Sequence, residues 1–374
     1  MGSLFIDVTE FVTNPIRTGI QRVIRELLGR WPADIPRRVV WFDDRVGGLV
    51  PVREELLAYL IDSPSDPVLD GEQTRRKSLD FLASTTPPAL DLRREDRVLV
   101  PELFASRARA LFYRRLRGRQ VSIRAIVYDI LAWTQPDALN ITTVGPFNDY
   151  LEFLKVTEAR CHISSAVRDA YTQRVLRRPG SADTVIVLGA DALGRRPADL
   201  PVLPQLLCPG ALDGRKGQDR IFDAYMAMPE ADRLPLIIAG RVPPEPRESI
   251  RRILDSSCPT VSVIDDPDDT RLSELIAGSQ GCLFPSQFEG FGLPALESLY
   301  LGTPVVIDAN LPAVSGLPAA GQIRLESQSR DDLVRALRQI SDPASAAALR
   351  QAAATLQLPT WADYAGQVAA WASQ

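Results

Sequence analysis

The stretch Phe284-Pro-Ser-Gln-Phe-Glu-Gly-Phe-Gly-Leu-Pro-Ala-Leu-Glu-Ser-Leu299 follows directly on a short apolar run that predicts a strand. Pro294 suits the first turn of a helix, so the stretch predicts a strand, a loop and then a helix. Gly290 and Gly292 allow the loop backbone to approach a ligand closely. Glu289 lies in this loop, and Glu297, seven intervening residues later, is expected in the first helical turn. A junction of this kind binds anions and hydroxyl groups, so the two carboxylates suit the hydroxyls of a sugar and of a ribose.

The string Glu289-Gly-Phe-Gly-Leu-Pro-Ala-Leu-Glu297, with Gly302-Thr-Pro-Val-Val-Ile307 after it, resembles the signature of the family 4 glycosyltransferases. The resemblance implies the glycosyltransferase-B (GT-B) arrangement, in which two Rossmann-like domains face a cleft. It also implies that Glu289 holds the hydroxyls of the donor sugar and that Glu297 binds the ribose. Three backbone N–H groups of the loop are expected to help: those of Phe291, Gly292 and Leu293. The alternative is an ordinary loop whose glycines turn the chain and whose glutamates are solvated or cap the helix.

A second loop, Pro209-Gly-Ala-Leu-Asp-Gly-Arg-Lys-Gly-Gln218, resembles the family's phosphate loop, whose arginine and lysine hold the donor diphosphate. Gly210 and Lys216 match the pattern, whereas Ala211 stands where the family has arginine, and Arg215 is the candidate to replace that charge. A cation and backbone N–H groups can stabilise a departing diphosphate without a metal ion. Since the segment between the two expected domains has no Asp-x-Asp motif, we expect no required metal. The alternative for Lys216 is an exposed lysine at a helix start.

The first apolar strand, Leu4–Val8, precedes a loop and a helix that begins at Thr18 or Gly19. Five residues are spaced for one face of that helix: Ile20, Val23, Ile24, Leu27 and Leu28. In family 4 the corresponding loop faces the donor diphosphate or the acceptor. The resemblance therefore assigns Thr18 and Gly19 to the donor, and Asn14 and Arg17 to the acceptor. An ordinary capped surface helix is the alternative.

Tyr128-Asp129 ends a further strand, where many family members have His-Asp. The resemblance places both residues near the acceptor and makes Asp129, with Lys216 and Glu289, one of three candidate catalytic residues. Arg241 follows another strand end, at Ala239-Gly240, and is expected to contact phosphate or base.

Strand and helix patterns alternate in both halves of the chain, which predicts parallel sheets with helices on both faces and ligands at the carboxyl ends of the strands. We expect an acceptor-binding domain at 1–190, a nucleotide-sugar-binding domain at 191–357, and a helix at 358–374 that crosses back onto the first domain. Residues 44–95 are the least regular and indicate a surface insertion with some helix near Glu54–Ile61. The last strand and helix of the second domain are expected at Thr303–Ile307 and Arg330–Ile340.

The amino-acid composition of the chain argues against several classes of protein, among them nucleic-acid-binding and metal-binding proteins. The chain has 374 residues, 45% of them apolar, and a net charge of -4, which disfavours a nucleic-acid partner. His162 is the single histidine, so we expect no metal site. The cysteines form no CxxC pair and indicate core residues in a reducing compartment: Cys161, Cys208, Cys258 and Cys282. Without a long apolar stretch or a signal-like start, the sequence predicts a cytoplasmic protein.

The segment Arg107–Arg119 contains six arginines and no acidic residue. It predicts a basic amphipathic helix that contacts an anionic membrane surface at the inner face. Four residues are expected to form its apolar side: Ala110, Leu111, Tyr113 and Leu116. A solvated surface helix is the alternative.

The leading interpretation is a retaining hexosyltransferase without a cofactor. It would transfer a hexose from GDP-mannose or a UDP-hexose to a saccharide or lipid-linked saccharide in polysaccharide or O-antigen-type assembly. A sugar-nucleotide epimerase of the same architecture is one alternative. A non-catalytic sugar-nucleotide-binding module is another, and the alanine at position 211 is its only support.

Overall fold

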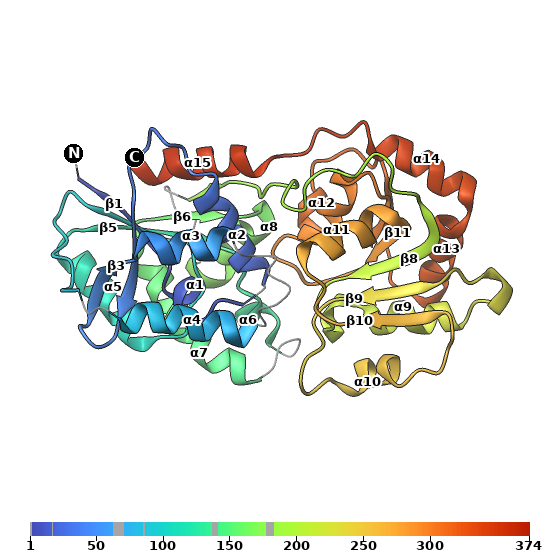
Figure 1. Ribbon diagram of the computed structural model, residues 1–374, viewed down its shortest axis with the longest axis horizontal. Coiled ribbons are helices and arrows are strands. Elements are labelled where there is room, and N and C mark those ends of the chain that lie inside the picture. Colours follow the sequence, from blue (N-terminus) through green and yellow to red (C-terminus); the bar gives the residue numbers. More distant parts are fainter. Residues whose placement is uncertain (1, 17, 63–70, 85–86, 137–140, 177–182) are drawn as a thin grey trace. The chain divides into compact units, whose positions relative to one another are not determined.

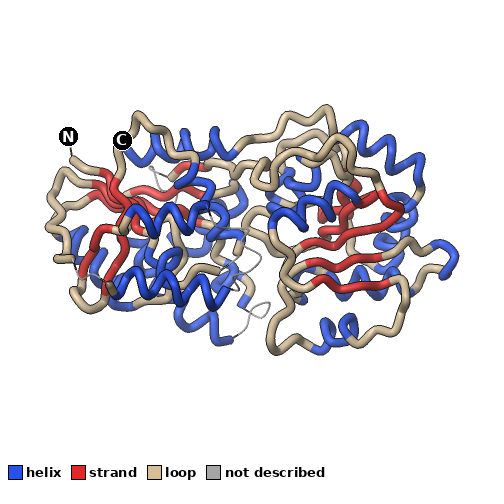
Figure 2. The backbone as a smooth tube through the Cα atoms, in the orientation of Figure 1, coloured by secondary structure: helices blue, strands red, loops and turns tan. Residues whose placement is uncertain are grey.

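The computed structural model describes residues 2–16, 18–62, 71–84, 87–136, 141–176 and 183–374. The chain divides into two compact units (Figure 1). Unit 1 comprises Met1–Gly189 and Thr360–Gln374, and unit 2 comprises Ala190–Pro359. These bounds differ by one or two residues from the ranges predicted above. In each unit the strands lie side by side with helices against them (Figure 2), which confirms the predicted class of two Rossmann-like α/β units.

The sheet of unit 1 has the order β3-β2-β1-β4-β5-β6-β7. All neighbouring pairs are parallel except β2 and β3, which form an antiparallel hairpin. The strands are β1 Leu4–Asp7, β2 Arg38–Asp43, β3 Gly48–Pro51, β4 Arg97–Val100, β5 Ser122–Val127, β6 Ala159–His162 and β7 Thr184–Val185. The stretch 44–95 is more regular than predicted, because it contains β3 and two helices.

The helices of unit 1 are α1 Thr9–Thr13, α2 Gly19–Gly29, α3 Glu54–Asp62, α4 Gly71–Ala83, α5 Arg107–Gly118, α6 Leu131–Thr134, α7 Ile141–Val156, α8 Ser165–Tyr171 and α15 Trp361–Ser373. The C-terminal helix α15 packs on α2 and β4, as predicted (Figure 1). Its end is held by two arginines of the sheet: Arg124 donates to the carbonyl of Trp371, and Arg97 donates to the carbonyl of Gln374 at 3.1 Å.

Unit 2 has a fully parallel sheet in the order β10-β9-β8-β11-β12-β13. Its strands are β8 Leu203–Pro209, β9 Leu236–Ala239, β10 Val261–Ile264, β11 Ser279–Phe284, β12 Val305–Asp308 and β13 Gln322–Leu325. Its helices are α9 Gln218–Met226, α10 Glu248–Leu254, α11 Asp269–Gly278, α12 Leu293–Tyr300, α13 Arg330–Ser341 and α14 Pro343–Ala353. Sequence reasoning missed β13 and α14. The edge strand has only two apolar residues, and α14 is built mainly from alanine, so neither shows a strong apolar period.

In the part of the chain that the structure describes, no helix combines the length and the apolar character needed to cross a bilayer.

Helix α5 differs from its predicted amphipathic pattern. Arg109, which the predicted pattern places on the surface, is fully buried. Leu111, predicted on the apolar side, is 45% exposed, and Phe112 is buried in its stead. Two other arginines of the segment pair with acids: Arg117 with Glu158 at 3.1 Å, and Arg119 with Asp91 at 2.8 Å. The exposed face of α5 is formed by Arg107, Leu111, Arg114 and Arg115.

Arg109 belongs to a buried ionic cluster that ties three loops of unit 1 together. Its Nη2 lies 2.7 Å from Asp7 Oδ2 at the end of β1 and 2.8 Å from Glu102 Oε2 beyond β4. All three side chains are fully buried. Glu102 also accepts hydrogen bonds from the backbone N–H groups of Glu10 and Phe11, at 2.9 and 2.8 Å. The cluster therefore fixes the start of α1 against the carboxyl ends of β1 and β4.

The cluster predicts an unusual dependence of stability on pH. Burial, with the nearby Asp7 and Glu10 carboxyls, raises the pKa of Glu102 to about 8 in spite of Arg109. A carboxyl group that binds its proton more tightly in the folded state stabilises the fold below its unfolded pKa, near 4.5, and this contribution is lost as pH rises through about 8.

We therefore expect the free energy of unfolding of unit 1 to fall between pH 5 and pH 8, and the Glu102→Gln variant to show a flatter profile. All five tryptophans belong to unit 1, so urea unfolding followed by tryptophan emission reports on this unit. The same slope in the variant and the wild type would contradict this assignment.

Candidate functional site

The order of strands in unit 2 brings the two predicted loops together. Strands β8 and β11 are hydrogen-bonded neighbours, and the chain continues from β8 to one side of the sheet and from β11 to the other. The loops that follow these strands therefore lie side by side at the carboxyl edge. Ligands of open parallel α/β sheets bind at this kind of reversal point.

Three predicted residues meet at this edge. Glu289 lies between the two cations: its Oε2 is 3.4 Å from Arg215 Nη1, and its Oε1 is 3.8 Å from Lys216 Nζ. Arg215 also donates to the carbonyl of Phe288 at 2.8 Å, so its side chain turns inward, as a replacement for the arginine missing at 211 requires. The side chains of Arg215, Lys216 and Glu289 are 18%, 15% and 13% exposed. The site is therefore accessible but largely enclosed.

Two residues that the sequence analysis did not single out position this group. Ser286, which is buried, donates its hydroxyl to Glu289 Oε1 at 2.9 Å. Gln218, also buried, donates to the carbonyls of Gly210 and Ala211 at 3.3 and 3.0 Å. Both lie within the quoted loops, but their orientation depends on contacts that no spacing rule gives.

Gly210 must be glycine for a local reason. Its φ is +117°, and a Cβ there would lie 3.2 Å from Lys216 Nζ. Arg241 follows Gly240 at the carboxyl end of the neighbouring strand β9, and its side chain is exposed. It lies at the same edge of the sheet as the two loops, and its predicted contact with phosphate or base remains a proposal.

The second loop runs from β11 into α12. Gly292 precedes the helix with a φ of +110°, and a Cβ there would lie 2.7 Å from Leu311 Cδ1. The helix begins at Leu293, one residue earlier than predicted, because Pro294 occupies the second helical position. Glu297 therefore lies in the second turn, not the first, and is 1% exposed. The first N–H groups of a helix have no partner within it, so this end of α12 can donate to a ligand.

The remaining residues of the loop lie between these two ends. Phe291 is buried and accepts a hydrogen bond from Ala313 N at 2.9 Å, which ties the loop to the segment after β12. Gly290 is buried next to it.

In unit 1 the predicted loop after α1 is ordered by Gln21. Its side chain accepts from Ile16 N and donates to the carbonyl of Asn14, both at 2.6 Å. Thr18 caps α2 by accepting from Gln21 N at 3.3 Å, and Gly19 is the exposed first residue of the helix. The Thr-x-x-Gln pattern of a capping box was the signal that could have identified this glutamine. Arg17 lies outside the described residues.

Tyr128 and Asp129, which follow β5, lie in different environments. Tyr128 is 3% exposed and donates its hydroxyl to the carbonyl of Pro101 at 2.9 Å, and burial raises the pKa of this hydroxyl well above its usual range. The hydroxyl of Tyr128 is thus engaged within unit 1, and its predicted contact with the acceptor stays a prediction. Asp129 is partly exposed and accepts from Leu131 N at 3.1 Å, which starts α6.

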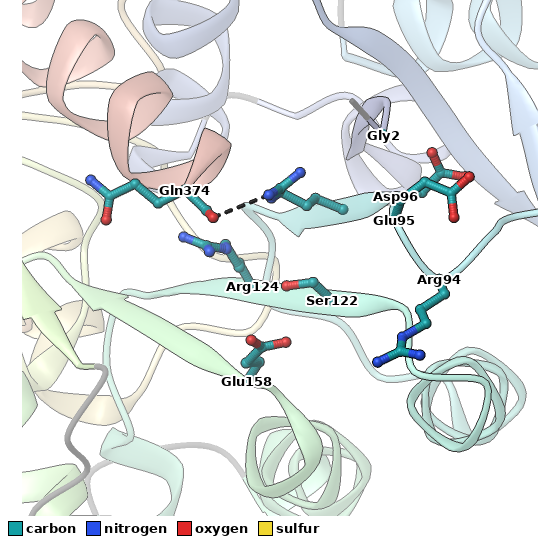
Figure 3. A pocket seen from close by; sticks show the side chains of 9 residues that line it. Gly2, Arg94, Glu95, Asp96, Ser122, Arg124, Glu158 and Gln374 are labelled. Carbon is teal, nitrogen blue, oxygen red and sulfur yellow. Dashed lines mark hydrogen bonds between the residues drawn. The ribbon is translucent and has the colours of Figure 1, made fainter.

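Two further observations concern metal ligands and a cavity of unit 1. Among the described residues, no three His, Cys, Asp or Glu side chains are grouped to hold a metal ion. A cavity of about 350 Å³ opens at the amino ends of β4 and β5 in unit 1, lined by Arg94, Arg97, Ser122, Arg124 and Glu158 among others (Figure 3). It lies at the opposite edge from the predicted site residues of that unit.

Residues 202–355 match the family model described as "Glycosyl transferases group 1". The matched residues lie within unit 2. The chain is 31% identical over 217 residues to a glycogen synthase of Mycobacterium tuberculosis, which covers 54% of this chain and 50% of the relative. It is 31% identical over 157 residues to the O-antigen chain mannosyltransferase B of Escherichia coli, covering 36% and 39% of the two chains. The chain thus spans half or less of the length of these relatives.

The fold extends over both units. Sucrose-phosphate synthase from Thermosynechococcus elongatus superimposes with a TM-score of 0.64 at 17% identity, covering 98% of this chain and 97% of that one. The chain therefore has the GT-B fold, as the sequence predicts.

Proposed function

We propose that this protein transfers a hexose from a nucleotide diphosphate sugar to a saccharide acceptor, with unit 2 binding the donor and unit 1 the acceptor. The observation that carries the proposal is the meeting of Arg215, Lys216 and Glu289 at the β8–β11 edge. Two cations and one carboxylate suit a ligand that has a diphosphate next to a sugar.

Each group has a distinct role in the proposal. Breaking the bond between the sugar carbon C1 and the phosphate oxygen leaves negative charge on the diphosphate, which Lys216 and Arg215 stabilise. Glu289 holds the two cations in the absence of ligand and accepts hydrogen bonds from sugar hydroxyls when the donor is bound. Glu297 accepts from the ribose. Because the cations supply the positive charge, we propose that no metal ion is required.

We propose a retaining transfer. The new bond from C1 to the acceptor oxygen forms on the face that the diphosphate leaves, and the acceptor proton passes to the departing phosphate oxygen. The names of both curated relatives refer to polysaccharides, and one is a mannosyltransferase, which supports a saccharide acceptor and GDP-mannose as the donor to test first. A UDP-hexose is the second donor to test. Arg215 also weakens the one argument for a non-catalytic binding module, the missing arginine at 211.

The decisive experiment measures transfer of radiolabelled sugar from GDP-mannose and from UDP-glucose, with and without oligosaccharide acceptors. Transfer that depends on an acceptor supports the proposal. Epimerised donor without an acceptor would instead indicate an epimerase, and binding without any turnover a binding module.

Glu297→Gln is expected to weaken nucleoside diphosphate binding about tenfold or more, because a hydrogen bond to a buried charged group contributes ~1.5–3 kcal/mol. Isothermal titration with GDP and UDP measures the change. Glu248→Gln, an exposed glutamate on α10 of the same unit, is the matched control. Equal Kd values for Glu297→Gln and the wild type would refute the ribose assignment.

We further propose that the exposed face of α5 (Arg107, Leu111, Arg114 and Arg115) contacts an anionic membrane surface. Three unburied arginines near such a surface contribute about 1 kcal/mol each, which gives reversible and salt-sensitive attachment. We expect cosedimentation with phosphatidylglycerol vesicles at low salt, release at high salt, and loss on changing the three arginines to glutamate. Arg251→Glu with Arg252→Glu, which reverses two charges on α10 of unit 2, is the control for a charge change elsewhere on the surface. Wild-type protein that ignores anionic vesicles at low salt would rule out this contact.

A further inference from the structure

Trp133 differs from every other tryptophan of the chain. Its side chain is 50% exposed, whereas the other four are at most 9% exposed: Trp31, Trp41, Trp361 and Trp371. A single exposed apolar residue is common on protein surfaces, so exposure alone assigns no role. Its position in the fold and its neighbours provide the further observations.

The backbone that presents Trp133 is firmly held. Helix α6 follows β5 after residues 128–130, at the carboxyl edge of the sheet, where parallel α/β proteins bind their ligands. The carbonyl of Ile130 accepts from the N–H groups of Trp133 and Thr134, both at 2.9 Å, and Ile130 is buried. Asp129 starts the same turn through its bond to Leu131 N at 3.1 Å. The indole is therefore exposed on a fixed turn that begins at a partly exposed aspartate, Asp129.

The residues around Trp133 in the sequence indicate which class of ligand would suit its exposed ring. The residues that follow it are polar or small and are partly or fully exposed: Thr134, Gln135 and Pro136. The sequence has no lysine or arginine between Arg124 and Lys155, so this turn offers no positive charge to an anionic lipid. One aromatic ring with a polar rim suits a ligand of the same character, which has a small apolar face bordered by hydroxyl groups. A pyranose ring is such a ligand.

We propose that Trp133 is the stacking surface for a sugar ring of the acceptor, and that Asp129, which starts the same turn, accepts hydrogen bonds from the sugar hydroxyls. This inference rests on the proposed function and adds to it the acceptor class, a neutral saccharide, and the residue that selects it. Stacking removes the apolar C–H face of the sugar and the indole ring from water together. The contact concerns acceptor binding and takes no part in the bond changes at C1.

The test uses the tryptophan emission of the intact protein and acrylamide as a neutral quencher. Because Trp133 is the exposed tryptophan, it dominates quenching in the wild type, and Trp133→Phe should lower the quenching constant. Maltoheptaose and an α-linked mannopentaose are the probes. Sorbitol, which has hydroxyl groups but no ring, is the control. We expect at least one oligosaccharide, but not sorbitol, to reduce quenching of the wild type.

Kinetics supply the second readout. In Trp133→Ala the KM for the acceptor is expected to rise about tenfold, because the loss of a favourable aromatic contact weakens binding by up to about tenfold. The rise in Trp133→Phe should be smaller, because phenylalanine keeps an aromatic ring. The kcat at saturating acceptor and the Kd for the nucleotide should not change. Because the side chain is exposed, the melting temperature of both variants should match the wild type.

The outcomes separate this inference from the proposed function. Sugar transfer with an unchanged acceptor KM in Trp133→Ala would overturn the role of Trp133 and leave the proposed function intact. Oligosaccharide protection of Trp133 without any transfer activity would support the sugar contact and overturn the proposed reaction. Protection by anionic vesicles, or by neither oligosaccharide, would overturn the sugar contact.

Discussion

Arg109→Met is expected to lower the free energy of unfolding of unit 1 by about 3–5 kcal/mol, the usual cost of removing one partner from a buried ion pair. The guanidinium contacts Asp7 and Glu102 at 2.7 and 2.8 Å, and its removal leaves these two buried acidic side chains without a cation. The Phe104 ring, 4.3 Å from the guanidinium carbon, also loses its cationic neighbour. Urea unfolding monitored by tryptophan emission measures the loss.

The matched control for this variant is Arg107→Met, two residues earlier on α5 and exposed. It should change the unfolding free energy by less than about 0.5 kcal/mol, as most surface substitutions do. Equal stability of the Arg109 and Arg107 variants would show that the cluster is not a major source of stability.

The second large effect concerns catalysis. Lys216→Met is expected to reduce kcat by about 10²–10³-fold, the effect of removing one group that stabilises charge in a transition state. Lys216 Nζ lies at the end of β8 between the Gly210 backbone and Glu289, where the departing diphosphate is proposed to bind. Methionine keeps the length of the side chain and removes its charge. Lys155→Met, an exposed lysine of α7 paired with Glu152, is the control and should retain full activity.

The same variant tests whether cations replace a metal ion. Wild-type transfer is expected to survive EDTA, and Mg²⁺ should not restore activity to Lys216→Met. Loss of wild-type activity in EDTA, with recovery on adding Mg²⁺ or Mn²⁺, would contradict the proposed source of charge. A normal kcat in Lys216→Met would remove this residue from the reaction.

The fold class and the loops of the candidate site could be predicted from the amino-acid sequence. Apolar strands, amphipathic helices and glycine loops are local signals, since each depends on residues within about ten positions of one another. The two loops of unit 2 could therefore be located individually. Their meeting follows from the neighbouring positions of β8 and β11, which the alternation of strands and helices alone does not specify.

The partners of individual polar side chains, in contrast, are known only from the folded chain. Arg109 has the spacing of a surface arginine but pairs with Asp7, which is 102 positions away in the sequence. Tyr128 occupies a predicted site position but donates its hydroxyl to the core, and Arg215 turns inward to reach Phe288 O. Burial of a charge or a hydroxyl is stable only where a partner is present, and such partners come from distant parts of the chain. For this reason the positions of the loops follow from the sequence, whereas the roles of these polar groups required the folded protein.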